Sequence, residues 1–149
     1  MTPFKERRCR ACGEGRVRLL AQPGRTTMYK FLECEVPAEL EIPTCDHCGS
    51  EWHDDHSAMR FDQAMEAVFR ADLLALAQRA IARIEGHAIR QSEVERVLGL
   101  SAGYLSKLKR GERSPEPALV SELMLVATDP AQRLAEVQEG WKTRLLPAS

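Results

Sequence analysis

The amino-acid sequence predicts an α+β fold, in which a small β-rich N-terminal region is followed by an all-α region of about five helices. Two patterns carry this prediction. Apolar and polar residues alternate with a period of two in the first part of the chain, whereas after residue 57 apolar residues recur at the three- and four-residue spacing of helices. A chain of 149 residues, of which 44% are hydrophobic, is long enough for one or two domains with a moderate core.

Two short cysteine motifs of equal spacing frame the β-rich region. Cys9 and Cys12 are followed by a glycine, as are Cys45 and Cys48, and 32 residues separate the two C-x-x-C pairs. Four thiolates in such pairs can close a tetrahedron around Zn²⁺, and the glycine after each pair permits the tight turn. The pattern predicts a closed, structural zinc site with one Zn²⁺ per chain. A mixed cysteine and histidine ligand set stays open, because three histidines lie in or just after the second motif: His47, His53 and His56.

Between the cysteine motifs the residues alternate as in β-strands. One such segment carries Arg16 and Arg18 on its polar side, and a later one carries Glu33 and Glu35. The first 30 residues hold eight Lys or Arg and two acids, whereas the next 27 hold eight acids and no Lys or Arg. Cross-strand ion pairs between the arginine and glutamate strands would explain this division, and a surface for a partner protein is the alternative. We expect Cys34, on the apolar side of its strand, to be a buried thiol.

A long helix is predicted to follow the strands. No proline or glycine interrupts residues 58–85, where apolar residues recur at helical spacing. The pattern indicates one amphipathic helix, or two successive ones, ended by Gly86. Its first half, through Phe61 and Met65, packs on its own chain or pairs with a second copy. We therefore divide the chain into a zinc-binding module at residues 1–57, a linking helix at residues 58–70 and a helical domain at residues 71–149.

The helical domain contains two short helices joined by a turn. Valines at helical spacing after Gln91 give the first helix an inner face. Gly99 turns the chain, Ser101 can cap the second helix, and Gly111 ends it. This arrangement is typical of a helix-turn-helix, whose second helix enters the major groove of double-stranded DNA.

Basic residues gather at the second helix of this motif. Lys107 is the best candidate for a base contact, because an ammonium donates to O6 and N7 of guanine, whereas Arg110 and Arg113 suit phosphates. A solvated basic helix end without a ligand is the alternative. The predicted DNA-contacting residues of this segment are Ser101, Ala102, Gly103, Tyr104, Ser106, Lys107, Lys109, Arg110 and Arg113.

Two more helices, at about residues 118–127 and 130–146, complete the predicted bundle. Helix-turn-helix proteins usually bind DNA as two-fold pairs, so we expect a homodimer on a palindromic operator. We favour the C-terminal domain as the dimer surface, because a contact near the DNA-contacting helices sets the spacing of the two half-sites most directly. The residues concerned are Leu134, Val137 and Trp141.

Several functional classes are disfavoured by the sequence. It contains no H-E-x-x-H motif, no glycine-rich phosphate loop and no three-ligand zinc pattern with an open position, so we do not expect an enzyme. Its apolar runs are far shorter than the roughly 20 residues of a membrane span, and its basic N-terminus lacks the apolar stretch of a secretory signal. We expect a cytoplasmic protein, in which cysteines are more often metal ligands than disulfide partners.

A family resemblance adds to this interpretation. Residues 89–125 resemble a Cro-repressor-type (XRE) domain, and together with the two cysteine motifs, V-P at 36–37 and I-P-T-C at 42–45 they resemble the MqsA (YgiT-type) antitoxins over nearly the whole chain. The resemblance implies a type II toxin–antitoxin system antitoxin. Its zinc-binding half would sequester a protein toxin, while its C-terminal half dimerises and represses its own operon. The resemblance also implies a phosphate contact for Gln91 and a base contact for Lys107.

Two residues differ from the pattern of that family. Gly103 stands where those antitoxins contact bases with a polar side chain, and Glu95 stands where a small residue usually lets the two helices pack closely. The second hypothesis for function is a free-standing, zinc-containing helix-turn-helix transcription regulator. A gene for a small toxin beside this one would favour the antitoxin over the regulator.

Overall fold

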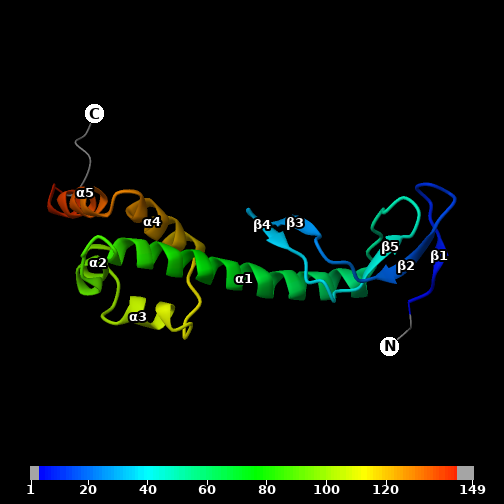
Figure 1. The fold of residues 1–149 in the computed structure, drawn as a ribbon, viewed down its shortest axis with the longest axis horizontal. Helices are drawn as coiled ribbons and strands as arrows, with labels where there is room; N and C mark the ends of the chain where they lie inside the picture. The colour runs from blue at the N-terminus through cyan, green and yellow to red at the C-terminus, as the bar shows by residue number, and fades with distance from the viewer. Residues whose placement is uncertain (1–3, 144–149) are drawn as a thin grey trace. The chain divides into compact units, whose positions relative to one another are not determined.

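The computed structural model describes residues 4–143, in which five short strands are followed by five helices, so the predicted α+β fold is confirmed (Figure 1). The strands are β1 (Arg7–Arg8), β2 (Arg16–Leu20), β3 (Thr26–Tyr29), β4 (Leu32–Glu35) and β5 (Ile42–Cys45). The helices are α1 (Asp55–Glu85), α2 (Gln91–Val97), α3 (Tyr104–Lys109), α4 (Pro117–Thr128) and α5 (Pro130–Thr143). The chain divides between Phe69 and Arg70 into two compact units. Within residues 4–143, no helix combines the length and the apolar character needed to span a membrane.

The N-terminal unit contains two separate antiparallel sheets. β2 lies between β1 and β5 in one sheet, and β3 pairs with β4 as a hairpin in the other. The predicted pairing of the arginine strand, β2, with the glutamate strand, β4, is therefore wrong. β2 follows the first cysteine motif, and β5 runs into the second. When the two motifs come together, these two strands are therefore placed side by side and pair. The guanidinium of Arg18 lies instead 3.6 Å from Glu6 and 3.4 Å from Asp46.

The β3–β4 hairpin packs on the N-terminal half of α1. The ring of Phe31 meets the ring of Phe69 edge to face, with 5.3 Å between centroids, and Nζ of Lys30 lies 2.7 Å from Oε2 of Glu66. Met65 is fully buried. The apolar stripe on this half of α1 is therefore covered by its own unit.

Cys34 is 1% exposed, which confirms the expected buried thiol on β4. The inward face of the hairpin also holds Thr27, opposite Cys34, whereas Met28 and Glu33 pair on the outward face. The two-residue alternation of the sequence thus reports the two faces correctly, although it did not identify which strands pair.

In the C-terminal unit, the remaining helices pack around the second half of α1. α1 is one continuous helix that ends at Glu85. Of the two predicted alternatives, one long helix or two successive ones, the first is therefore confirmed. Figure 1 shows α3 and α4 on opposite sides of this part of α1. α4 extends one residue beyond each predicted end, and α5 is described to Thr143, so its predicted end near Leu146 lies outside the described residues. The core of the unit includes Leu73, Ile81, Ile84, Leu105, Leu108 and Leu123.

Candidate metal centre and helix-turn-helix segment

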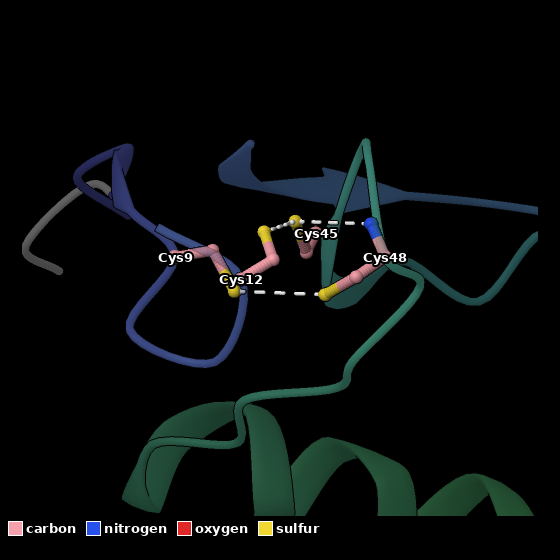
Figure 2. Close-up of side chains that lie close together, drawn as sticks. All are labelled: Cys9, Cys12, Cys45 and Cys48. Atoms are coloured by element: carbon pink, nitrogen blue, oxygen red, sulfur yellow. Dashed lines mark hydrogen bonds between the residues drawn. The ribbon is translucent and has the colours of Figure 1, made fainter. Parts of the chain in front are cut away.

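The four predicted metal ligands come together at one point of the N-terminal unit. The Sγ atoms of Cys9, Cys12, Cys45 and Cys48 all lie within 4.8 Å of one another. Figure 2 shows the two cysteine pairs facing each other from two separate loops. Sγ of Cys9 lies 3.7 Å from that of Cys48, and Sγ of Cys12 lies 3.7 Å from that of Cys45. A tetrahedral zinc site with Zn–S bonds of about 2.3 Å has edges of about 3.8 Å, so the residues fit one structural Zn²⁺ per chain.

The two cysteine motifs adopt the same turn. The N–H of Gly13 donates to the carbonyl of Cys9 at 3.0 Å, and the N–H of Gly49 donates to the carbonyl of Cys45 at 3.1 Å. The two glycines have φ angles of 71° and 73°, in the left-handed region that favours glycine. This shared conformation explains why a glycine follows each C-x-x-C pair.

Backbone N–H groups point at the sulfur atoms. Gly15 donates to Sγ of Cys12 at 3.4 Å, and His47 and Cys48 donate to Sγ of Cys45 at 3.4 and 3.5 Å. Hydrogen bonds of this kind are strengthened when the acceptor carries a negative charge. The turns therefore prepare the sulfurs to be thiolates, which is the form that binds zinc.

The thiol pKa values respond to these surroundings. The N–H of Cys12 lowers the pKa of Cys9, and the N–H of Gly15 lowers that of Cys12. The N–H of Cys48 acts to lower the pKa of Cys45 as well, but burial and the neighbouring thiols outweigh it and raise this pKa to about 11. Because Zn²⁺ must displace the thiol protons, zinc binding weakens as the pH falls.

A third glycine belongs to the site, although the sequence analysis did not single it out. A Cβ atom at Gly15 would lie 2.5 Å from Sγ of Cys45 and 2.6 Å from Cβ of His47, so no side chain fits there. Asp46 also connects the motifs, because its Oδ1 accepts the N–H of Arg16 at 2.8 Å. The only sequence signal for Gly15 is its position two residues after the glycine of the first motif.

The histidines near the second motif have other partners. Nε2 of His47 lies 2.8 Å from the carboxylate of Glu14, and His53 packs on Phe61 with 5.2 Å between ring centroids. His56 is exposed in the first turn of α1. Within residues 4–143 the metal-binding group consists of cysteines alone.

The two short helices of the predicted helix-turn-helix are α2 and α3, but the second begins differently from the prediction. Gly103, with a φ of 78°, occupies the N-cap position, so the expected cap by Ser101 is wrong. The carboxylate of Glu95 accepts the N–H groups of Gly103 at 3.1 Å and Leu105 at 3.0 Å. The start of α3 is therefore capped from α2 rather than by its own preceding residue.

The predicted DNA-contacting residues differ in their surroundings. Lys109 is paired with Glu85 at 2.8 Å, and Arg110 is paired with Glu112 at 2.7 Å. Lys107 is exposed and forms no ion pair with a described residue. The guanidinium of Arg113 lies over the ring of Tyr104 at 4.7 Å. Of the others, Ser101 and Ala102 are exposed, and Gln91, Gly103, Tyr104 and Ser106 are half-buried.

Comparison with known proteins leaves the chain without an assigned family. No family model matches the sequence, and no curated protein is similar enough to count as a match.

The metal site predicts how single substitutions change zinc content. Cys45→Ser removes a buried ligand, so bound zinc should fall well below one ion per chain in metal analysis. Gly15→Ala leaves all four ligands but forces its Cβ against Sγ of Cys45, which should weaken zinc binding by about 10- to 100-fold. Cys34→Ala, a buried cysteine of the same unit, is the control and should keep full zinc content. Full occupancy in Cys45→Ser would contradict this ligand set.

Proposed function

We propose that this protein is an antitoxin whose C-terminal unit binds operator DNA and whose N-terminal zinc unit sequesters a protein toxin. The observation that best supports the DNA half is the exposed basic end of α3 beside the turn from α2. Lys107 is free to donate to a base edge, since it forms no ion pair with a described residue. Arg113 is exposed in the segment after α3, where it suits a phosphate contact.

Two of the basic residues are restrained by carboxylates. The bond to Glu112 raises the pKa of Arg110 and lowers the pKa of Glu112, so this pair is ionised at neutral pH. Lys109 donates to both carboxylate oxygens of Glu85. A phosphate must compete with these carboxylates, so in this proposal Lys107 and Arg113 carry more of the DNA contact than Lys109 and Arg110.

The antitoxin half of the proposal is supported by the resemblance and by the outward face of the β3–β4 hairpin. On this face Met28 is 66% exposed, and Phe31, in the turn between the two strands, is 62% exposed although its ring also meets Phe69. Glu33 and Glu35 lie on the same face, are exposed, and form no ion pair with a described residue. This face suits a basic protein with an apolar patch.

We also propose that two copies pair through the C-terminal unit. A groove of about 680 Å³ there includes Leu125 and Trp141, which are 65% and 69% exposed. Nε1 of Trp141 donates to the carbonyl of Val97 at 2.8 Å, which holds the indole at the groove. The rim carries Glu122 and Arg133, so a second copy related by a two-fold axis can set opposite charges against each other. The alternative stripe on α1 is covered within its own unit.

The free-standing regulator is the second candidate. A four-cysteine metal site in one unit and an exposed basic helix in the other fit a zinc-containing regulator without any toxin. The two candidates differ only in the partner of the N-terminal unit.

Substitutions around α3 should separate base contact from phosphate contact. Lys107→Ala should cost about 1–3 kcal/mol of binding free energy on the preferred operator and relax base choice at one position per half-site. Glu112→Gln releases Arg110, so it should strengthen binding to all sequences and steepen the salt dependence by about one unit per half-site. Binding titrations at several salt concentrations measure both effects. Glu139→Gln, an exposed change on α5, is the control. Equal effects of Lys107→Ala on specific and random DNA would contradict a base contact.

The groove predicts a variant that separates the two copies. Leu125→Glu places a charge in an apolar groove. Because the side chain of Leu125 is exposed, the variant should fold normally, which a melting curve checks. The variant should sediment as a monomer at concentrations where the unchanged protein is a dimer. Ala118→Glu, on the exposed surface of the same helix, should stay dimeric. A monomeric unchanged protein, both free and on DNA, would contradict the pairing.

The hairpin face predicts a variant that fails as an antitoxin but still binds DNA. Glu33→Lys combined with Glu35→Lys reverses two exposed charges of the full chain, so it should abolish growth rescue from a toxin encoded by the neighbouring gene. Zinc content and operator binding should be unchanged. Glu139→Lys, an exposed reversal in the C-terminal unit, should rescue normally. If the neighbouring gene is not toxic and its product does not bind the full chain, the free-standing regulator replaces the antitoxin.

A further inference from the structure

One ligand of the four-cysteine site differs from the other three in its exposure to solvent. Cys48 is exposed and Cys12 is half-buried. Cys9 and Cys45 are only 1% and 2% exposed. The turn after Cys48 is open as well, because a Cβ atom placed on Gly49 would meet nothing within 4 Å beyond its chain neighbours. A small molecule from solvent therefore has direct access to the sulfur of Cys48 among the four ligands.

A buried cysteine of the other motif lies directly beside Cys48. Sγ of Cys9 is 3.7 Å from Sγ of Cys48, on the opposite loop (Figure 2). An S–S bond is about 2.05 Å long, so these two sulfurs have to approach each other by about 1.7 Å, which side-chain rotation can provide. The contact between Cys12 and Cys45, also of 3.7 Å, runs between the motifs too. The site therefore favours a disulfide across the two motifs over one within a C-x-x-C pair.

We propose that Cys48 is a site of oxidation by hydroperoxides, and that Cys9 converts the oxidised sulfur into a disulfide. An accessible thiolate beside a second, resolving cysteine is the arrangement in which reversible oxidation of cysteine occurs. Cys48 supplies the accessible sulfur, and Cys9 supplies the second sulfur behind it. The proposal goes beyond the proposed function, because it depends on the four-cysteine site and not on DNA or a toxin.

The reaction takes place in two steps and uses one molecule of hydroperoxide. The Cys48 thiolate attacks one peroxide oxygen, the O–O bond breaks, hydroxide leaves, and the sulfur becomes a sulfenic acid. The Cys9 thiolate then attacks this sulfur, the S–O bond breaks, a second hydroxide leaves, and the S–S bond forms. Two electrons pass from the two sulfurs to the peroxide, so hydrogen peroxide is reduced to two hydroxide ions, which take up protons as water.

The disulfide changes the metal site without separating the two loops. Both oxidised sulfurs leave the ligand set, and Cys12 and Cys45 alone cannot close a tetrahedron, so zinc is released. The new bond joins the same two loops that the four ligands join. β2 and β5 should therefore stay paired in the oxidised protein, whereas a chelator should unpair them in the reduced protein.

The test uses the full-length, zinc-loaded protein and an equimolar amount of hydrogen peroxide. A chromogenic indicator follows zinc release, and mass spectrometry without reduction maps the disulfides. Cleavage after Arg10 separates the two cysteines of the first motif, and cleavage before Asp46 separates those of the second. The expected product is a Cys9–Cys48 disulfide for each zinc ion released. Cys34, which is 1% exposed, is the internal control and should remain a free thiol.

A matched pair of variants tests the role of exposure. Cys48→His and Cys12→His each replace a thiol by another zinc ligand, and metal analysis confirms that both are loaded before oxidation. Cys48→His removes the attacked sulfur, so it should slow peroxide-driven zinc release by about 10-fold or more. Cys12→His removes a half-buried sulfur that takes no part in the first disulfide, so zinc should leave at about the rate of the unchanged protein.

Two results would overturn the proposal. One is a main product with disulfides within the motifs, from Cys9 to Cys12 or from Cys45 to Cys48. The other is an unchanged rate of zinc release in Cys48→His. Amide hydrogen exchange in β2 and β5 tests the structural consequence, and loss of protection in protein that carries the Cys9–Cys48 disulfide would contradict it. Because neither DNA nor a toxin enters these measurements, failure of the proposed function leaves their outcome unchanged.

Discussion

Closure of four thiolates around one ion is the constraint on which the N-terminal unit depends. The buried cluster beside the site consists of Cys9, Val17 and Cys45, with Phe4 and Trp52 partly buried against it. Two of its three buried members are metal ligands, so the side of the sheet next to the site is packed largely by the ligands themselves. In a unit this small, the free energy of metal binding is in large part the free energy of folding. The same closure explains why β2 pairs with β5.

The metal site could be predicted from the sequence because spacing alone determines it. Two C-x-x-C-G motifs require the same turn, and both glycines have the left-handed φ that this turn needs. Strand pairing could not be predicted in the same way, because alternation identifies the face of a residue but not the neighbour of its strand. The role of Gly15 was missed for a related reason. It depends on the approach of Cys45, which is 30 positions away in the sequence.

The helical unit shows a different limit. The positions of the helices could be predicted from apolar spacing and from glycines: α4 starts and ends within one residue of the prediction, and α5 starts at the predicted residue. The cap of α3 could not be predicted in this way. Ser101 is a suitable N-cap by local sequence, whereas Glu95, which accepts the N–H groups at the start of α3, lies on the preceding helix. A carboxylate on α2 outcompetes a local hydroxyl here, since it accepts two backbone N–H groups and is held by Gln91 as well. Glu95, one of the two residues that differ from the pattern of the antitoxins that the sequence resembles, thus has a structural role in this chain.

Although the chain has a net charge of −1, its charges are unevenly distributed, and basic side chains gather at the end of α3. In the three-stranded sheet, Arg18 lies between two acids, Glu6 and Asp46. At α3 the pairing is selective, because Lys109 and Arg110 have carboxylate partners and Lys107 has none among the described residues. If the protein binds DNA as proposed, these carboxylates weaken the general attraction to phosphate and leave the ammonium of Lys107 available for a base, which raises the share of the binding free energy that depends on sequence. In the proposed repressor, the glutamates near α3 therefore favour the operator over random DNA.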